Sequence, residues 1–250
     1  MTVRTAALVG AAGGAGTTRS AVELAGVLAR TGRAALVFDL DFATQGLSRC
    51  VGGRVEPDAT ALLADPDLPL ADAVTDWPVP GDGRLAVVPA FAPFVDVAGA
   101  KAPEAAARVG DRLREATDAF DHVLVDVPPV SANQAVAAVD AADRVAAVVP
   151  PDDRGGEALQ RARGRLQDVG TTLDVAIATR TGTDAAPVDA DAVVPPLPEK
   201  RAPDRPAAVD AGGPAVAAVA ETAATLFETD VDVGADGRGS MLDRLRRRLA

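Results

Sequence analysis

The sequence predicts an α/β fold, a doubly wound, mostly parallel sheet flanked by helices. Short apolar runs alternate with helical stretches along most of the 250 residues. The apolar runs are continuous rather than interrupted at every second residue, which is typical of strands buried under helices on both faces. The first run also leads through a glycine-rich loop into a helix, an arrangement that can bind phosphate at the edge of such a sheet.

The elements follow in order from the N-terminus. We expect a strand over Thr5–Gly10, a helix over Thr17–Arg30 and a second strand over Ala34–Asp39. Gly32 lies where a helix C-terminus favours glycine. Later strands are expected at 85–88, 123–126, 145–149 and 175–178. Later helices are expected at 101–120, 133–143, 155–169 and 213–227.

Composition divides the chain into three segments. The predicted domain spans residues 1–227, and within it the Pro- and Asp-rich stretch 54–82 is expected to be irregular with one short helix. Residues 228–239 are rich in Asp and Gly and are expected to form a flexible linker. Residues 240–250 form a separate terminal tail.

The composition restricts the class of protein. No run approaches the roughly 18 apolar residues of a membrane span, and the N-terminus lacks the layout of a signal peptide, so we expect a cytoplasmic protein. Cys50 is the only cysteine, which excludes an intrachain disulfide and a cysteine-only metal site within one chain. The 48% of hydrophobic residues suffice for a sizeable core, and the scarcity of aromatics predicts one built from small side chains.

The charge is strongly acidic. The net charge is −11, and Lys occurs only at Lys101 and Lys200. An Asp-rich, nearly Lys-free surface resembles proteins of salt-loaded cytoplasms, those of haloarchaea above all, where salt screens the repulsion between carboxylates. A GC-rich genome, whose codons favour Arg, Ala, Asp and Val, is the alternative explanation. In either case, DNA binding through the acidic body is not expected.

The glycine-rich loop reads GAAGGAGTTR from Gly10 to Arg19. It resembles the deviant Walker loop of the MinD/ParA family of P-loop ATPases, which reads KGGxGKTT. The resemblance implies an ATP- or ADP-binding loop with magnesium on the hydroxyl of Thr18. The implied nucleotide-binding residues are Gly13, Gly14, Ala15, Gly16, Thr17, Thr18 and Arg19.

Both lysines of the family loop are missing, because the two positions hold Ala12 and Thr17. A charged hydrogen bond to phosphate contributes about 1.5–3 kcal/mol to binding. Loss of cationic stabilisation of the transferring phosphoryl group typically lowers the rate about 10²- to 10³-fold. We therefore expect hydrolysis to be weak or lost. The loop either binds nucleotide weakly or is only a tight turn, and Arg19 is a candidate replacement for the lysine.

Two acidic positions also match the family. Asp39 and Asp41 end the second strand, with Gln45 shortly after, and Asp126 ends the strand before a Val-Pro-Pro turn. The resemblance implies that Asp41 and Asp126 are the catalytic carboxylates and that both act with Thr18, indirectly, at the magnesium site. In such sheets ligands bind at the carboxyl ends of the strands. The alternative is that each Asp only caps a strand end.

Further matches follow toward the C-terminus. Thr179 and Arg180 stand where the family has its base-reading Asn-Arg, so the asparagine is absent. Pro196 lies in a Pro-rich stretch that resembles the strand enclosing adenine. Together with the Gly-Gly-Pro at 212–214, these matches extend the resemblance over about residues 5–227.

The tail has one apolar face. On a helical wheel its apolar residues fall within one arc and its arginines on the remainder. The apolar residues are Met241, Leu242, Leu245 and Leu249, and the arginines include Arg244 and Arg247. This tail resembles the membrane-targeting helix of MinD-type members, and it has the pattern of an interfacial anchor. A groove on a partner protein and a disordered basic tail are the alternatives.

These expectations combine into one functional hypothesis. The resemblance implies a spatial-positioning protein for cell division, chromosome partitioning or placement of a surface structure. With a degenerate nucleotide site, it would act as a scaffold or adaptor, peripheral on the inner face of the cell membrane. A homodimer would present two weak tails at once. The alternatives are a slow ATPase cycling between membrane and cytosol, and a regulator that binds another ParA-type protein or nucleic acid.

Overall fold

The computed structural model describes residues 2–52, 55–151, 154–181, 189–198 and 206–233. Eight strands form one sheet in the order β3-β4-β2-β5-β1-β6-β7-β8. All neighbouring strands are parallel except β3, which pairs antiparallel with β4 at one edge. The strands are β1 Thr5–Gly10, β2 Ala34–Asp39, β3 Thr75–Trp77, β4 Arg84–Val88, β5 His122–Val127, β6 Arg144–Val149, β7 Val175–Thr179 and β8 Ala192–Val194.

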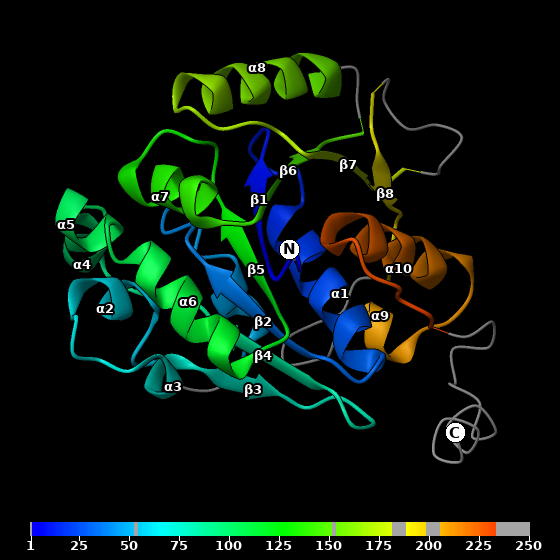
Figure 1. Cartoon of the computed structure of the whole chain (residues 1–250), viewed down its shortest axis with the longest axis horizontal. Helices are drawn as coiled ribbons and strands as arrows, with labels where there is room; N and C mark the ends of the chain where they lie inside the picture. The colour runs from blue at the N-terminus through cyan, green and yellow to red at the C-terminus, as the bar shows by residue number, and fades with distance from the viewer. Residues whose placement is uncertain (1, 53–54, 152–153, 182–188, 199–205, 234–250) are drawn as a thin grey trace.

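Helices cover both faces of this sheet (Figure 1). On one face α1 packs against α9 and α10, and α10 also contacts β8. The opposite face carries α2 and α4 to α8. Their bounds are α1 Thr17–Arg30, α2 Ala59–Ala64, α3 Leu70–Ala73, α4 Phe94–Ala100, α5 Pro103–Ala106, α6 Val109–Ala119, α7 Asn133–Ala141, α8 Arg154–Asp168, α9 Ala207–Asp210 and α10 Pro214–Phe227, with a 3₁₀ turn at Leu47–Cys50.

Alternate strand residues point to the two faces. Leu8 joins the core under α1, whereas its neighbours Ala7 and Val9 join the core on the opposite face. Both cores consist mainly of Ala, Val and Leu, as the composition predicts. The doubly wound parallel sheet is thereby confirmed, and the first two strands and first helix have the predicted bounds.

Two predictions about the segments between strands were wrong. The stretch 54–82 holds the two helices α2 and α3 and the strand β3, rather than one short helix. A three-residue edge strand is too short to produce a recognisable period. The single helix expected at 101–120 is divided into α5 and α6, and α5 begins at Pro103. The helix α4 was not predicted.

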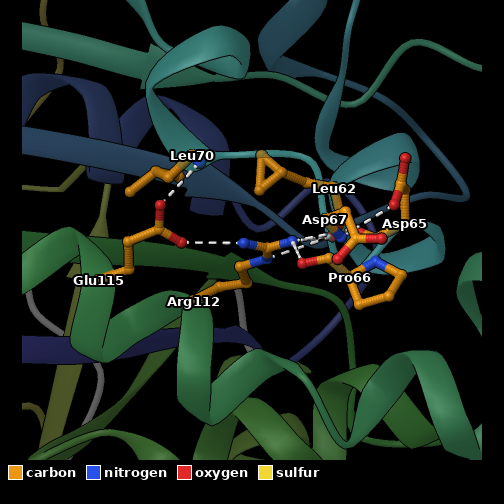
Figure 2. A network of polar contacts seen from close by, with 7 residues as sticks. All are labelled: Leu62, Asp65, Pro66, Asp67, Leu70, Arg112 and Glu115. Atoms are coloured by element: carbon orange, nitrogen blue, oxygen red, sulfur yellow. Dashed lines mark hydrogen bonds and ion pairs between the residues drawn. The ribbon is translucent and has the colours of Figure 1, made fainter.

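A buried arginine ties the stretch between α2 and α3 to α6 (Figure 2). Arg112 is only 7% exposed, and its guanidinium forms an ion pair with Glu115 at 2.9 Å. Glu115 in turn accepts a hydrogen bond from the backbone N–H of Leu70 at 2.8 Å. The guanidinium also donates to the carbonyls of Leu62, Asp65 and Pro66. A single cation therefore satisfies backbone acceptors that no helix or strand pairs.

Among the described residues, no helix is long and apolar enough to cross a membrane. The linker from residue 234 onward and the whole tail lie outside the described residues, so their predicted forms stay predictions.

Candidate functional site

The glycine loop joins the end of β1 to the start of α1. Gly14 and Gly16 have φ values of 73° and 93°, which lie in the left-handed region that favours glycine. Gly16 is the N-cap of α1 and offers no side chain to the first N–H groups of the helix. The unpaired amides and the helix dipole together favour an anion at this point. The conformation is that of a loop able to hold phosphate.

The two positions that have lost their lysines bring no cation to the loop. The hydroxyl of Thr17 lies against the end of β1, because a Cβ built on Gly10 would be 2.8 Å from Thr17 Oγ1. A side chain at position 10 would force the Thr17 hydroxyl to shift. Ala12 contributes its carbonyl, which accepts the N–H of Ala15 at 3.2 Å.

Arg19 is held away from the loop. Its Nε forms an ion pair with Glu23 at 2.7 Å, and its Nη2 donates to the carbonyl of Pro198 at 2.7 Å. Glu23 is fully buried and also accepts the N–H groups of Ala207 and Ala208 at the start of α9. Arg19 therefore joins α1 to the C-terminal part of the fold, and in this arrangement it does not replace the lysine.

The carboxyl ends of β2 and β5 bring two carboxylates together. Asp39 and Asp126 are register partners on these strands and are 0% and 1% exposed. The side chain of Thr18, from the first turn of α1, lies close enough to Asp126 to lower the pKa of that carboxyl. Thr18 Oγ1 would lie 3.0 Å from a Cβ on Gly46, so this glycine leaves room for the hydroxyl. The fold thus places Thr18 beside Asp126, as the family pattern requires.

Burial dominates the electrostatics of this pair. Desolvation, with a smaller effect of Asp41, raises the pKa of Asp126 to about 7, although the neighbouring Thr18 side chain opposes the shift. Desolvation and then the charge of Asp126 raise the pKa of Asp39 well above its usual range. Two adjacent buried carboxyls resist simultaneous ionisation unless a cation joins them. The pair therefore holds a proton to higher pH than an exposed carboxyl does.

One oxygen of this pair has no partner in the described structure. Asp126 Oδ2 is buried and accepts no hydrogen bond. A carboxylate oxygen beside a threonine hydroxyl is the donor chemistry that Mg²⁺ prefers. Within the described ranges, no three His, Cys, Asp or Glu side chains form a complete metal cage. The residues therefore fit a magnesium ion that is held by the Thr18 hydroxyl, phosphate and water, with Asp126 acting indirectly.

Asp41 follows β2 at the same edge of the sheet, and its carboxylate accepts hydrogen bonds from the loop that comes next. Its carboxylate accepts the hydroxyl of Thr44 at 2.6 Å and the N–H groups of Ala43 and Thr44 at 3.3 Å. It is close enough to Asp126 to influence the pKa of that carboxyl. The next side chain of this loop, Gln45, donates to the carbonyl of Ala92 at 2.8 Å. The loop after β2 is therefore held next to the start of α4.

The end of β7 lies against the glycine loop, which the sequence did not predict. The hydroxyl of Thr179 donates to the carbonyl of Ala15 at 2.7 Å, and Arg180 Nη2 donates to the carbonyl of Gly14 at 2.9 Å. The family resemblance predicted that Arg180 binds nucleotide, because it stands in a base-reading motif, but it did not predict contact with the glycine loop. Pro196 follows β8 and is exposed. Only the strand order, in which β6 and β7 follow β1, reveals that Arg180 reaches the loop.

Comparisons with known proteins agree with this fold. A model of the AAA domain family matches residues 3–178. The solved structure of the cell division ATPase MinD from Pyrococcus furiosus is 20% identical with a TM-score of 0.69, covering 90% of this chain and 98% of that one. MinD in the MinC:MinD complex of Aquifex aeolicus is 19% identical with a TM-score of 0.67, covering 92% and 98%.

A further solved structure carries a nucleotide. The septum site-determining protein MinD from Pyrococcus horikoshii, complexed with Mg-ADP, is 22% identical with a TM-score of 0.62 and covers 77% of this chain and 81% of that one. No curated protein matches the sequence significantly. At these identities the solved structures establish the fold alone, whereas the family model covers well over half of the chain. The chain therefore belongs to the AAA domain family, and its fold is that of the solved MinD structures.

Proposed function

We propose that this chain is a MinD/ParA-like spatial-positioning protein that binds Mg-nucleotide weakly, hydrolyses it slowly or not at all, and acts as a membrane-associated scaffold or adaptor. One observation carries the proposal. The loop keeps its phosphate-binding backbone and its Thr18–Asp126 pair, yet positions 12 and 17 hold alanine and threonine. Binding and turnover are separable because backbone amides hold phosphate, whereas lysine stabilises the transferring group.

The retained residues have definable roles at such a site. The amides between Gly13 and Thr18 would hold the phosphates, and the Thr18 hydroxyl and Asp126 would hold magnesium, Asp126 indirectly. A magnesium ion bound beside Asp126 would supply positive charge to the phosphates. Asp41 would orient a water molecule or the magnesium shell. Without a lysine, charge that develops in the transition state has weaker stabilisation, so turnover is slow.

The kind of cellular role follows from the similar proteins and the tail. The similar solved proteins are a septum site-determining protein, a cell division ATPase and MinD bound to MinC. A partner protein and a homodimer are therefore proposed here as well. The tail supplies a membrane contact in which Met241, Leu242, Leu245 and Leu249 enter the interface. Arg244 and Arg247 then face lipid phosphates.

Co-sedimentation with vesicles tests the membrane role. The full chain should bind vesicles that contain anionic lipid, and a chain ending at Gly239 should not. Leu245→Asp should weaken binding as strongly as the deletion, because it places a charge in the apolar face. Asp243→Asn, on the polar face, serves as the matched control and should bind at least as well. Equal binding by the full and shortened chains would contradict the membrane role.

Nucleotide should change this binding little. Adding Mg-ATP tests whether the protein instead cycles between membrane and cytosol as a slow ATPase. That second candidate is favoured by the unpartnered Asp126 Oδ2, which suits a magnesium ion. Vesicle binding that requires Mg-ATP and is lost in Asp126→Ala would replace the scaffold by this cycle.

A further inference from the structure

A guanidinium lies on the phosphate loop although the loop itself has lost its lysines. Arg180 follows β7 directly, and its Nη2 donates to the carbonyl of Gly14 at 2.9 Å. Gly14 is the second of the two adjacent glycines in the loop. The side chain is exposed. A cation therefore reaches the loop from a strand remote in sequence.

The backbone holds Arg180 firmly in this position. Its φ of 55° is unusual for a non-glycine residue, and its N–H donates to the carbonyl of Val194 on β8 at 2.8 Å. The preceding residue, Thr179, is 2% exposed, and its hydroxyl shares its one hydrogen between the carbonyls of Ala15 at 2.7 Å and Val149 at 3.2 Å. Such a strained conformation persists only where the surrounding structure determines it. The base of the Arg180 side chain is thus anchored to β6, β8 and the loop.

The chemistry of this side chain suits phosphate. A guanidinium carries five N–H donors in a planar fork, and the hydrogen bond to Gly14 takes one of them. A guanidinium pairs with phosphate oxygens in two parallel hydrogen bonds. Arg19, which is closer in sequence, is already engaged by Glu23 and Pro198.

We propose that Arg180 supplies the positive charge that contacts the phosphates of a bound nucleotide in this chain, in place of the missing loop lysines. The inference rests on the nucleotide site of the proposed function, and it names the residue that compensates for Ala12 and Thr17. It also gives Arg180 a phosphate role rather than a role at the base.

Calorimetry with Mg-ATP, and displacement of Mg-ATP by Mg-pyrophosphate, test this proposal. Arg180→Ala should lower the affinity for both compounds about 10- to 100-fold, because each loses a charged hydrogen bond. Arg180→Lys should restore part of the affinity, since a point charge replaces the fork. Arg161→Ala, which removes an exposed arginine paired with Glu157 on α8, is the matched control and should bind as the wild type does.

The outcomes separate this inference from the proposed function. Unchanged Mg-ATP affinity in Arg180→Ala would overturn the inference and leave the nucleotide site standing. A loss for Mg-ATP without a loss for Mg-pyrophosphate would assign Arg180 to the base or ribose and also overturn it. A wild type that binds neither compound at millimolar concentration would overturn both the inference and the nucleotide site. Equal melting temperatures of the ligand-free variants and the wild type exclude a general loss of structure.

Discussion

Replacing Asp126 with asparagine should stabilise the protein increasingly as the pH rises from 5 to 8. The carboxyl is 1% exposed, and burial raises its pKa from 3.8 to about 7. A group whose pKa is raised by folding contributes stability below its unfolded pKa, and that contribution is lost as the pH rises through its folded pKa. The wild type therefore becomes less stable over this window through Asp126. The neutral amide does not titrate and removes this dependence.

The magnitude follows from the two pKa values. A shift of about three units corresponds to roughly 4 kcal/mol between the acidic and alkaline limits. Between pH 5 and pH 8, linkage to these two values gives a change of about 2.5 kcal/mol in the difference between variant and wild type. The amide also buries an N–H donor at a cost of about 1–3 kcal/mol, but this cost is the same at every pH. The change of the difference with pH is therefore the quantity to measure.

Urea unfolding at a series of pH values measures how the stability difference between variant and wild type changes with pH. The free energy of unfolding of Asp126→Asn minus that of the wild type should rise by about 2.5 kcal/mol from pH 5 to pH 8. The variant also removes the negative charge of Asp126, which raises the pKa of the neighbouring Asp39. Loss of this repulsion should add to the rise. Asp96→Asn, at an exposed position of α4, is the control and should show no comparable trend. A difference that stays constant with pH would refute the reasoning.

Three further predictions concern stability. Arg112→Met should lower the free energy of unfolding by about 3 kcal/mol, because it leaves buried carbonyls without a donor. The same change at the exposed Arg114 should alter the free energy of unfolding little, and urea unfolding of both variants tests this. Phe94 is 87% exposed, so Phe94→Ser should change the free energy of unfolding by less than about 0.5 kcal/mol. Phe38 is fully buried, so Phe38→Ala should lower it by about 3–5 kcal/mol. Comparable losses of stability by the two variants in thermal melts would contradict the described burial. Desolvation lowers the pKa of His122 from 6.5 to about 4, so stability should fall by about 1–3 kcal/mol as the pH drops through this window, and urea titrations of His122→Gln should lack this fall.

Local patterns predicted the centre of the fold. The bounds of β1, α1 and β2 could be predicted because continuous apolar runs end at glycines or at charged residues. The nearness of Thr18 and Asp126 was instead implied by the resemblance to the MinD/ParA family, and it agrees with the rule that ligands bind at the carboxyl ends of the strands.

Contacts between remote segments could not be predicted in this way. Arg180 reaches the loop because β7 lies two strands from β1 on the side of β6, and the sequence does not state the strand order. Arg19 appeared to be the closer cation, but its partner Glu23 is occupied at the start of α9, 184 residues later in the chain. The short strand β3 forms only through pairing with β4. For Arg180 and Arg19 the deciding partner is distant in sequence, whereas β4 follows shortly after β3 and only the shortness of β3 hid it.

Steady-state hydrolysis of Mg-ATP by the wild type and by Thr17→Lys tests the central claim most directly. If the site is intact except for its lysines, the wild type should turn over near background, and the restored lysine should raise the rate about tenfold or more. The rate gained should disappear when Asp126→Ala is added. A wild type that hydrolyses as fast as Thr17→Lys, or a restored lysine that leaves both binding and rate unchanged, would contradict the account of a retained phosphate loop that lacks only its lysines.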